Sequence, residues 1–129
     1  MEIDKKIIFL VDDEPTNLSV GQAVLEDHYD VLPLRSGAGL LKALEKTMPD
    51  LILLDIDMPE MDGFETIRLL KDNPETESIP VIFLTARKDD DSKAAGLYLG
   101  AVDFLHKPFD PPRLIKQIGA VLLGSSISG

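Results

Sequence analysis

Carboxylate, hydroxyl and ammonium side chains follow four separate apolar runs of this chain, and together they could carry out phosphoryl transfer. Asp12 and Asp13 follow the first run, Asp55 the third, Thr85 the fourth and Lys107 the fifth. Three carboxylates held together repel one another and need a cation to offset their charge. Mg²⁺ suits such ligands, because it typically binds one or two carboxylates together with a phosphate oxygen. A carboxylate could then attack phosphorus while the ammonium and hydroxyl groups hold the phosphoryl oxygens.

Five short apolar runs must position these residues, and we interpret all five as strands. Three of them are nearly continuous in Ile, Leu, Val and Phe, which favours strands covered on both faces in a parallel sheet. The predicted strands are Lys6 to Val11, Asp30 to Arg35, Leu51 to Leu54, Val81 to Leu84 and Val102 to His106.

Segments with helical spacing follow each predicted strand. Pro15 suits the first position of a helix, Ser36 can cap the second helix, and Gly100 can take the left-handed conformation that ends the fourth. Because strand and helix alternate five times, we expect an α/β fold in which helices cover both faces of a parallel sheet. The expected helices cover about residues 15–25, 36–44, 64–71, 89–99 and 111–122.

The position of the acidic residues also predicts the strand order. Open α/β sheets bind ligands beyond the carboxyl ends of their strands, near the point where strand order reverses. The second run ends in Arg35-Ser36-Gly37 and contributes no acid, as expected for an outermost strand in the order 2-1-3-4-5. The sequence therefore predicts a doubly wound (βα)5 sandwich of the flavodoxin-like class, in which the other four strand ends meet at one site.

Composition limits the possible environments and partners. The chain has 129 residues, the size of one domain, and its 23 acidic against 13 basic residues give a net charge of −10. Such a charge repels a phosphate backbone, so we expect no direct binding to nucleic acid. There is no cysteine and no apolar run long enough to span a bilayer. We therefore expect a cytoplasmic protein with no membrane association.

Four motifs in this order resemble the response-regulator receiver family of two-component signalling. The resemblance covers residues 5 to 123 and implies the same (βα)5 fold. The motifs are Val11-Asp12-Asp13-Glu14-Pro15, Asp55-Ile56-Asp57-Met58-Pro59-Glu60-Met61-Asp62-Gly63, Leu84-Thr85-Ala86 and Gly100-Ala101-Val102-Asp103-Phe104-Leu105-His106-Lys107-Pro108-Phe109.

The resemblance implies a role for each residue of the predicted site. Asp55 would be the phosphoacceptor, phosphorylated by a histidine kinase or a histidine phosphotransfer protein. Mg²⁺ would be held by Asp12, Asp13 and Asp55, and the backbone carbonyl of Asp57 would complete the metal site. Lys107 would pair with Asp55 at rest and with the phosphoryl group afterwards.

The resemblance also implies a switch. The Thr85 hydroxyl would move to a phosphoryl oxygen, and Phe104, at the family's aromatic switch position, would turn inward into the vacated space. The Lys107-Pro108 peptide bond would be cis, and Asp57 and Arg87 would flank the path of the attacking water and tune the lifetime of the phosphate.

A partner surface follows from the same resemblance. It would be formed by the fourth helix, the fifth strand and the fifth helix, near residues 89–122. An output domain or a downstream protein would read its change of shape, and a homodimer could form through it. The chain would take part in phosphotransfer and self-dephosphorylation without being an enzyme in the usual sense.

Other interpretations of the same residues stay open. Taken alone, Asp12 and Asp13 are an acidic helix start, Thr85 a cap, Lys107 a solvated charge and Phe104 a core residue. One alternative function is a Mg²⁺-dependent phosphohydrolase of the haloacid-dehalogenase type, which also uses an Asp-x-Asp pair. The other is a stand-alone receiver that only binds partners.

The expected domain covers residues 1–123. The small residues 124–129 are expected to form a flexible tail, which could be the start of an interdomain linker or an artificial end of the chain.

Overall fold

Five parallel strands form the central sheet of the computed structural model, which describes residues 5–127. Their order, β2-β1-β3-β4-β5, is the one predicted from the placement of the acids. Each bound lies within one residue of the predicted bound, which is the usual uncertainty of strand ends. The strands are β1 (Ile7–Val11), β2 (Asp30–Leu34), β3 (Leu51–Asp55), β4 (Val81–Thr85) and β5 (Asp103–His106).

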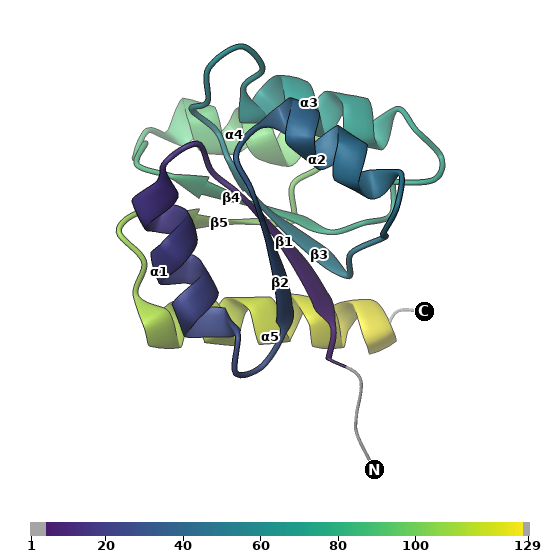
Figure 1. Cartoon of the computed structure of the whole chain (residues 1–129). Helices are drawn as coiled ribbons and strands as arrows, with labels where there is room; N and C mark the ends of the chain where they lie inside the picture. The colour runs from purple at the N-terminus through teal and green to yellow at the C-terminus, as the bar shows by residue number, and fades with distance from the viewer. Residues whose placement is uncertain (1–4, 128–129) are drawn as a thin grey trace.

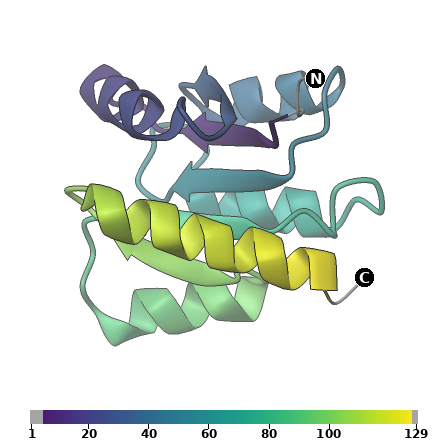
Figure 2. The same cartoon turned by 90° about the horizontal axis from the view of Figure 1, so that it is seen from below.

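Five helices cover both faces of this sheet and complete the predicted doubly wound α/β fold. Helices α2, α3 and α4 lie on one face, and α1 and α5 lie on the other (Figures 1 and 2). No helix within residues 5–127 is long and apolar enough to cross a membrane. The helices are α1 (Pro15–Leu25), α2 (Gly37–Leu44), α3 (Gly63–Lys71), α4 (Asp90–Leu99) and α5 (Pro111–Ile127).

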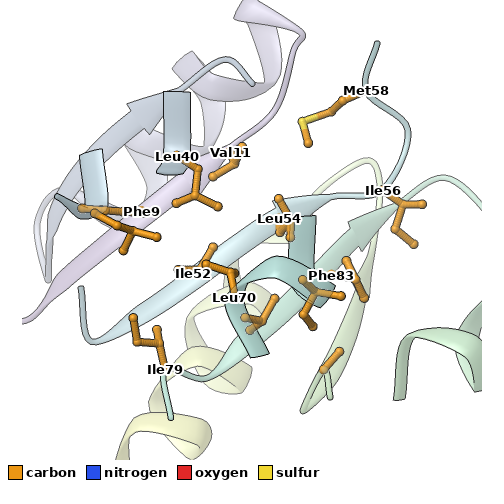
Figure 3. Packing of buried hydrophobic residues seen from close by; sticks show 14 of the residues in the cluster. Phe9, Val11, Leu40, Ile52, Leu54, Ile56, Met58, Leu70, Ile79 and Phe83 are labelled. Carbon is orange, nitrogen blue, oxygen red and sulfur yellow. The ribbon is translucent and has the colours of Figure 1, made fainter. Parts of the chain in front are cut away.

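The core consists of two apolar layers, one on each face of the sheet. All five residues of β3 and all five of β4 are buried, which explains why these runs are apolar without alternation. Alternate strand residues face opposite layers, so Ile52 and Leu54 join one layer and Leu51 and Leu53 join the other. Figure 3 shows the layer beneath α2, α3 and α4, in which Phe83 packs near the centre.

Side-chain caps fix the first turns of three helices near the carboxyl edge of the sheet. Ser36 accepts a hydrogen bond from the backbone N–H of Gly39, Asp62 from Glu65 and Asp89 from Ser92, at 2.8 to 2.9 Å. Such caps satisfy N–H groups that have no partner within the helix. The loops that follow Asp55 and Thr85 are therefore anchored at their helical ends.

The last helix is longer than the sequence predicts. We expected it to end near Leu122, and α5 continues to Ile127, into the stretch expected to be a flexible tail. Glycine and serine cost a helix no more than about 1 kcal/mol each relative to alanine, so nothing in this stretch stops a helix as proline would. Residues 128–129 of the expected tail, and residues 1–4, lie outside the described part.

Candidate functional site

Three carboxylates meet at the carboxyl edge of the sheet, as the sequence predicts. Asp12 and Asp13 follow β1, and Asp55 is the last residue of β3. One oxygen from each lies within 4.8 Å of the others. Asp12 is fully buried and Asp55 is 3% exposed, whereas Asp13 is half-buried and faces solvent in part. The cluster is therefore a buried pair of acids with one side open to solvent through Asp13.

The backbone holds the two buried acids firmly. The Asp12 N–H donates to the Leu34 carbonyl at 3.0 Å, and one Asp12 carboxylate oxygen accepts from the Glu14 N–H at 3.0 Å. Asp55 pairs with Leu84 in the sheet. These contacts place both side chains on the rigid framework of neighbouring strands, with little freedom to move apart.

Lys107 is the cation of the site. Its ammonium lies 2.6 Å from Oδ2 of Asp12 and 3.1 Å from Oδ1 of Asp55. Burial opposes the charge on this ammonium, but the hydrogen bond to Asp12 and the charges of both carboxylates outweigh burial and raise its pKa. The Lys107 N–H donates to the Thr85 carbonyl at 2.9 Å, and the Lys107–Pro108 peptide bond is cis, the form that the resemblance implies.

Asp55 has an unusually high affinity for protons because it is buried beside a second acid. Burial is the largest cause, followed by the charge of Asp12, and together they raise the pKa of Asp55 to about 7 against the partial relief that Lys107 provides. In the absence of a further cation, the Asp55 carboxyl therefore gains or loses its proton near neutral pH.

The donor set of the cluster fits a hard divalent cation. All three side chains offer carboxylate oxygens, the ligand type that Mg²⁺ prefers. Oδ2 of Asp12 is buried, and among the described residues its partner is the Lys107 ammonium, which Asp12 shares with Asp55. A cation beside these oxygens would supply the missing positive charge. The residues present are therefore compatible with Mg²⁺.

A glycine makes room beside the acceptor strand. A Cβ at Gly63, the first residue of α3, would lie 2.6 Å from the Asp55 carbonyl oxygen and 2.8 Å from Cα of Ile56. The Gly63 N–H donates to the Ile56 carbonyl at 2.7 Å. Any side chain at this position would push α3 away from the end of β3, so the Asp62-Gly63 pair positions the loop and does more than form a turn.

Thr85 lies at the end of β4, beside β3, and is 1% exposed. Its hydroxyl oxygen accepts a hydrogen bond from the Arg87 N–H at 2.8 Å. The structure thus brings Asp12, Asp13, Asp55 and Lys107 together and places Thr85 on the adjacent strand end, whereas the roles assigned to them stay predictions.

Asp57 and Arg87 form a pair that sequence reasoning did not foresee. Nε and Nη2 of Arg87 donate to the two Asp57 carboxylate oxygens at 3.1 and 2.5 Å. This bonding raises the pKa of the guanidinium. The Asp57 side chain is exposed and lies outside the group formed by the other three acids. The sequence does contain a signal for this pair, because Asp57 and Arg87 carry opposite charges and each lies two residues beyond the end of its strand, β3 or β4.

Phe104 lies inward in this structure, and its turn on activation stays a prediction. The ring is 8% exposed, and its centroid lies 5.6 Å from that of Phe83. Gly96 of α4 is the physical reason, since a Cβ there would lie 2.5 Å from Cζ of Phe104. The absent side chain leaves the space that the ring occupies.

The geometry agrees with what comparison with known proteins shows. Residues 8–119 match the response regulator receiver domain, and the chain therefore belongs to that family. This finding confirms the resemblance inferred from the four motifs. Receiver domains are signalling domains of two-component systems, so the chain is primarily a signalling domain.

Two relatives and one crystal structure illustrate the range of the family. PilH of Pseudomonas aeruginosa is 40% identical over 118 residues, 91% of this chain and 98% of PilH. A probable cyclic di-GMP phosphodiesterase of Vibrio cholerae is 41% identical over 117 residues, 91% of this chain but only 26% of that protein. The signal receiver domain of a signal transduction histidine kinase from Syntrophus aciditrophicus has a TM-score of 0.84 and 37% identity, covering 92% of this chain and 91% of that one.

Proposed function

We propose that this receiver domain accepts a phosphoryl group on Asp55 from a phosphohistidine of a histidine kinase or a histidine phosphotransfer protein, in a Mg²⁺-dependent reaction. The observation that carries the proposal is the buried Asp55 carboxylate, which shares one ammonium with a second buried acid. Such a site carries more negative than positive charge, and a nucleophile lies at its centre.

The transfer requires the ionised form of Asp55. A carboxylate oxygen of Asp55 forms a bond to phosphorus, the P–N bond of the phosphohistidine breaks, and the imidazole leaves with the electron pair and takes up a proton. Lys107, already 3.1 Å from Asp55, moves its contact to a phosphoryl oxygen as charge develops there. The Thr85 hydroxyl, on the neighbouring strand end, donates a hydrogen bond to another phosphoryl oxygen.

Asp12, Asp13 and Asp55 would hold Mg²⁺ through their side chains, together with the backbone carbonyl of Asp57. The cation would neutralise negative charge on the carboxylates and on the phosphoryl oxygens. It would also hold the pKa of Asp55 below the value of about 7 that burial and Asp12 produce, and so keep the nucleophile ionised at neutral pH.

The face formed by α4, β5 and α5 would carry the signal to an output domain, a downstream protein or a second copy of the chain. Leu97 and Tyr98 of α4 are exposed, and so is Val102, which directly precedes β5. The reaction would take place in the cytoplasm. The occurrence of the family both in PilH, of nearly the same length, and in a much longer phosphodiesterase fits either a separate protein or a part of a larger one.

The structure gives no support to the phosphohydrolase alternative. That mechanism needs the second acid of the Asp-x-Asp pair to act at the same centre as the first, but the Asp57 carboxylate is bonded to Arg87. The partner-binding alternative predicts no phosphorylation at all, so an experiment can distinguish it from the proposed function.

Incubation with acetyl phosphate and Mg²⁺, followed by intact mass measurement, tests the proposed function. We expect one added phosphoryl group, and no addition in the presence of a chelator or in Asp55→Asn. Absence of the adduct in the wild-type protein would favour the partner-binding alternative. Turnover of many small phosphate esters would favour the hydrolase.

A further inference from the structure

Arg87 joins three elements near the phosphoacceptor. From the loop between β4 and α4, its guanidinium binds both oxygens of Asp57 in the loop after β3. Its Nη1 donates to the Ser92 hydroxyl in α4 at 3.2 Å, and its Cζ lies 5.7 Å from the centroid of the Phe64 ring in α3. One side chain thus holds the acceptor loop, α3 and the first turn of α4 together.

Helix α4 depends on such contacts because its apolar anchoring is small. Ser92 and Gly96 are its only buried residues, Leu99 at its end is partly buried against the core, and Leu97 and Tyr98 are exposed. Hydrophobic stabilisation is proportional to the apolar area removed from water, and serine and glycine bury little of it. The Arg87–Ser92 contact and the Asp89 cap therefore contribute a large share of what fixes the start of this helix.

The same residue also contacts the hydroxyl that responds to the phosphoryl group in the proposed function. The Arg87 N–H donates to Oγ1 of Thr85 at 2.8 Å. If the Thr85 hydroxyl turns toward a phosphoryl oxygen, this contact weakens and the backbone of the loop is free to shift. A phosphoryl group on Asp55 would add a second anion to the site, and the planar guanidinium suits phosphate oxygens as well as a carboxylate.

We infer that Arg87 is a positioning residue that transmits the phosphorylation state of Asp55 to α4 by exchanging its partners. In the unphosphorylated protein the guanidinium ties Asp57 to Ser92 and holds the first turn of α4 in place. Phosphorylation draws the guanidinium toward the new negative charge, Ser92 loses its partner and the start of α4 loosens. This inference rests on the proposed function and goes beyond it by naming the residue that carries the signal.

Hydrogen exchange of the α4 amides, measured by mass spectrometry with and without phosphorylation, tests the inference. In the wild-type protein we expect exchange over residues 90–99 to rise about fivefold on phosphorylation, a typical size for coupling between two sites. In Arg87→Gln the exchange should already be raised without phosphorylation, and the further rise should be less than half that of the wild type. The matched control is Arg113→Gln on α5, whose guanidinium contacts Gln117, and it should behave as wild type.

Ser92→Ala provides a second, independent arm of the experiment, because Ser92 lies outside the acid cluster. It should be phosphorylated at the wild-type rate and show the same reduced response in α4. A purely structural role of Arg87 would raise exchange equally in both states and leave the response to phosphorylation unchanged, which would overturn the inference. So would a wild-type response in Ser92→Ala. Intact mass is recorded first, and a wild-type protein that takes no phosphoryl group would refute the proposed function instead.

Discussion

The Lys107 ammonium lies 3.1 Å from the Asp55 carboxylate while it also bridges to Asp12 at 2.6 Å. One cation between two buried acids leaves a net negative charge inside the protein, which is unfavourable unless another cation or a proton arrives. The proposed chemistry uses this imbalance, because the same charges that would attract Mg²⁺ also control the protonation of the nucleophile.

Removal of the Lys107 ammonium should impair both stability and phosphorylation. Lys107→Met leaves Asp12 and Asp55 without their shared partner, and we expect a loss of about 3 kcal/mol in the free energy of unfolding at pH 8. The rate of phosphorylation by acetyl phosphate should fall about 100-fold, as when one donor to a developing anion is lost. Urea unfolding and intact mass measure the two effects. Lys46→Met, at an exposed position, is the control, and equal behaviour of the two variants would refute the role of Lys107.

The Asp55 carboxyl should make the metal-free protein less stable as the pH rises from about 4 to about 7. Its pKa is about 7 in the folded protein and near 3.8 in the unfolded chain. Over this range the folded state binds more protons than the unfolded state, so the contribution of this group to the free energy of unfolding falls with rising pH. The full effect is about 4 kcal/mol at most.

Asp55→Asn should consequently be more stable than the wild type at pH 8 and should lose this advantage toward pH 4. Urea unfolding of both proteins at a series of pH values, in the presence of a chelator, measures the difference. A difference in the free energy of unfolding that does not vary with pH would contradict the raised pKa of Asp55.

Much of this site could be predicted from the sequence because parallel strands bring their carboxyl ends to one edge. Asp12, Asp55 and Lys107 needed only the strand order to be placed together. For the Asp57–Arg87 pair the sequence offered only the opposite charges after adjacent strands, because the contact itself depends on the path of two loops and on side-chain rotamers. The inward position of Phe104 depends on the absence of a side chain at Gly96, in a helix whose distance from the sheet the sequence does not specify.

Glu60 adopts a left-handed backbone conformation, with φ of 70°, and its replacement by glycine should stabilise the protein. This conformation costs a residue with a Cβ about 1–2 kcal/mol. Glycine avoids that cost, but its greater freedom in the unfolded chain cancels about 0.5–1 kcal/mol of the gain in stability. We expect Glu60→Gly to gain about 0.5–1 kcal/mol in urea unfolding. Glu60→Ala removes the same carboxylate and keeps the strain, so a comparable gain in that variant would show that charge, not backbone strain, is responsible.

A methyl group at position 96 should displace the Phe104 ring. In Gly96→Ala the new Cβ would lie 2.5 Å from Phe104 and 2.9 Å from Phe83, and overpacking of this kind costs about 1–3 kcal/mol. Urea unfolding and the ring resonances of Phe104 measure the effect. Gly119→Ala is the matched control, because nothing lies within 4 Å of a Cβ there, and the higher helix propensity of alanine should stabilise it by up to about 1 kcal/mol. Equal effects of the two substitutions would contradict the packing of Phe104 against Gly96.

The most direct test of the central claim is to identify the residue that carries the phosphoryl group. After reaction with acetyl phosphate and Mg²⁺, borohydride reduction converts an aspartyl phosphate into homoserine, which peptide mass spectrometry locates. We expect homoserine at position 55 alone, and none after reaction in the presence of a chelator. Homoserine at position 12, 13 or 57 in place of 55, or its absence from a protein that has gained a phosphoryl group, would contradict Asp55 as the phosphoacceptor.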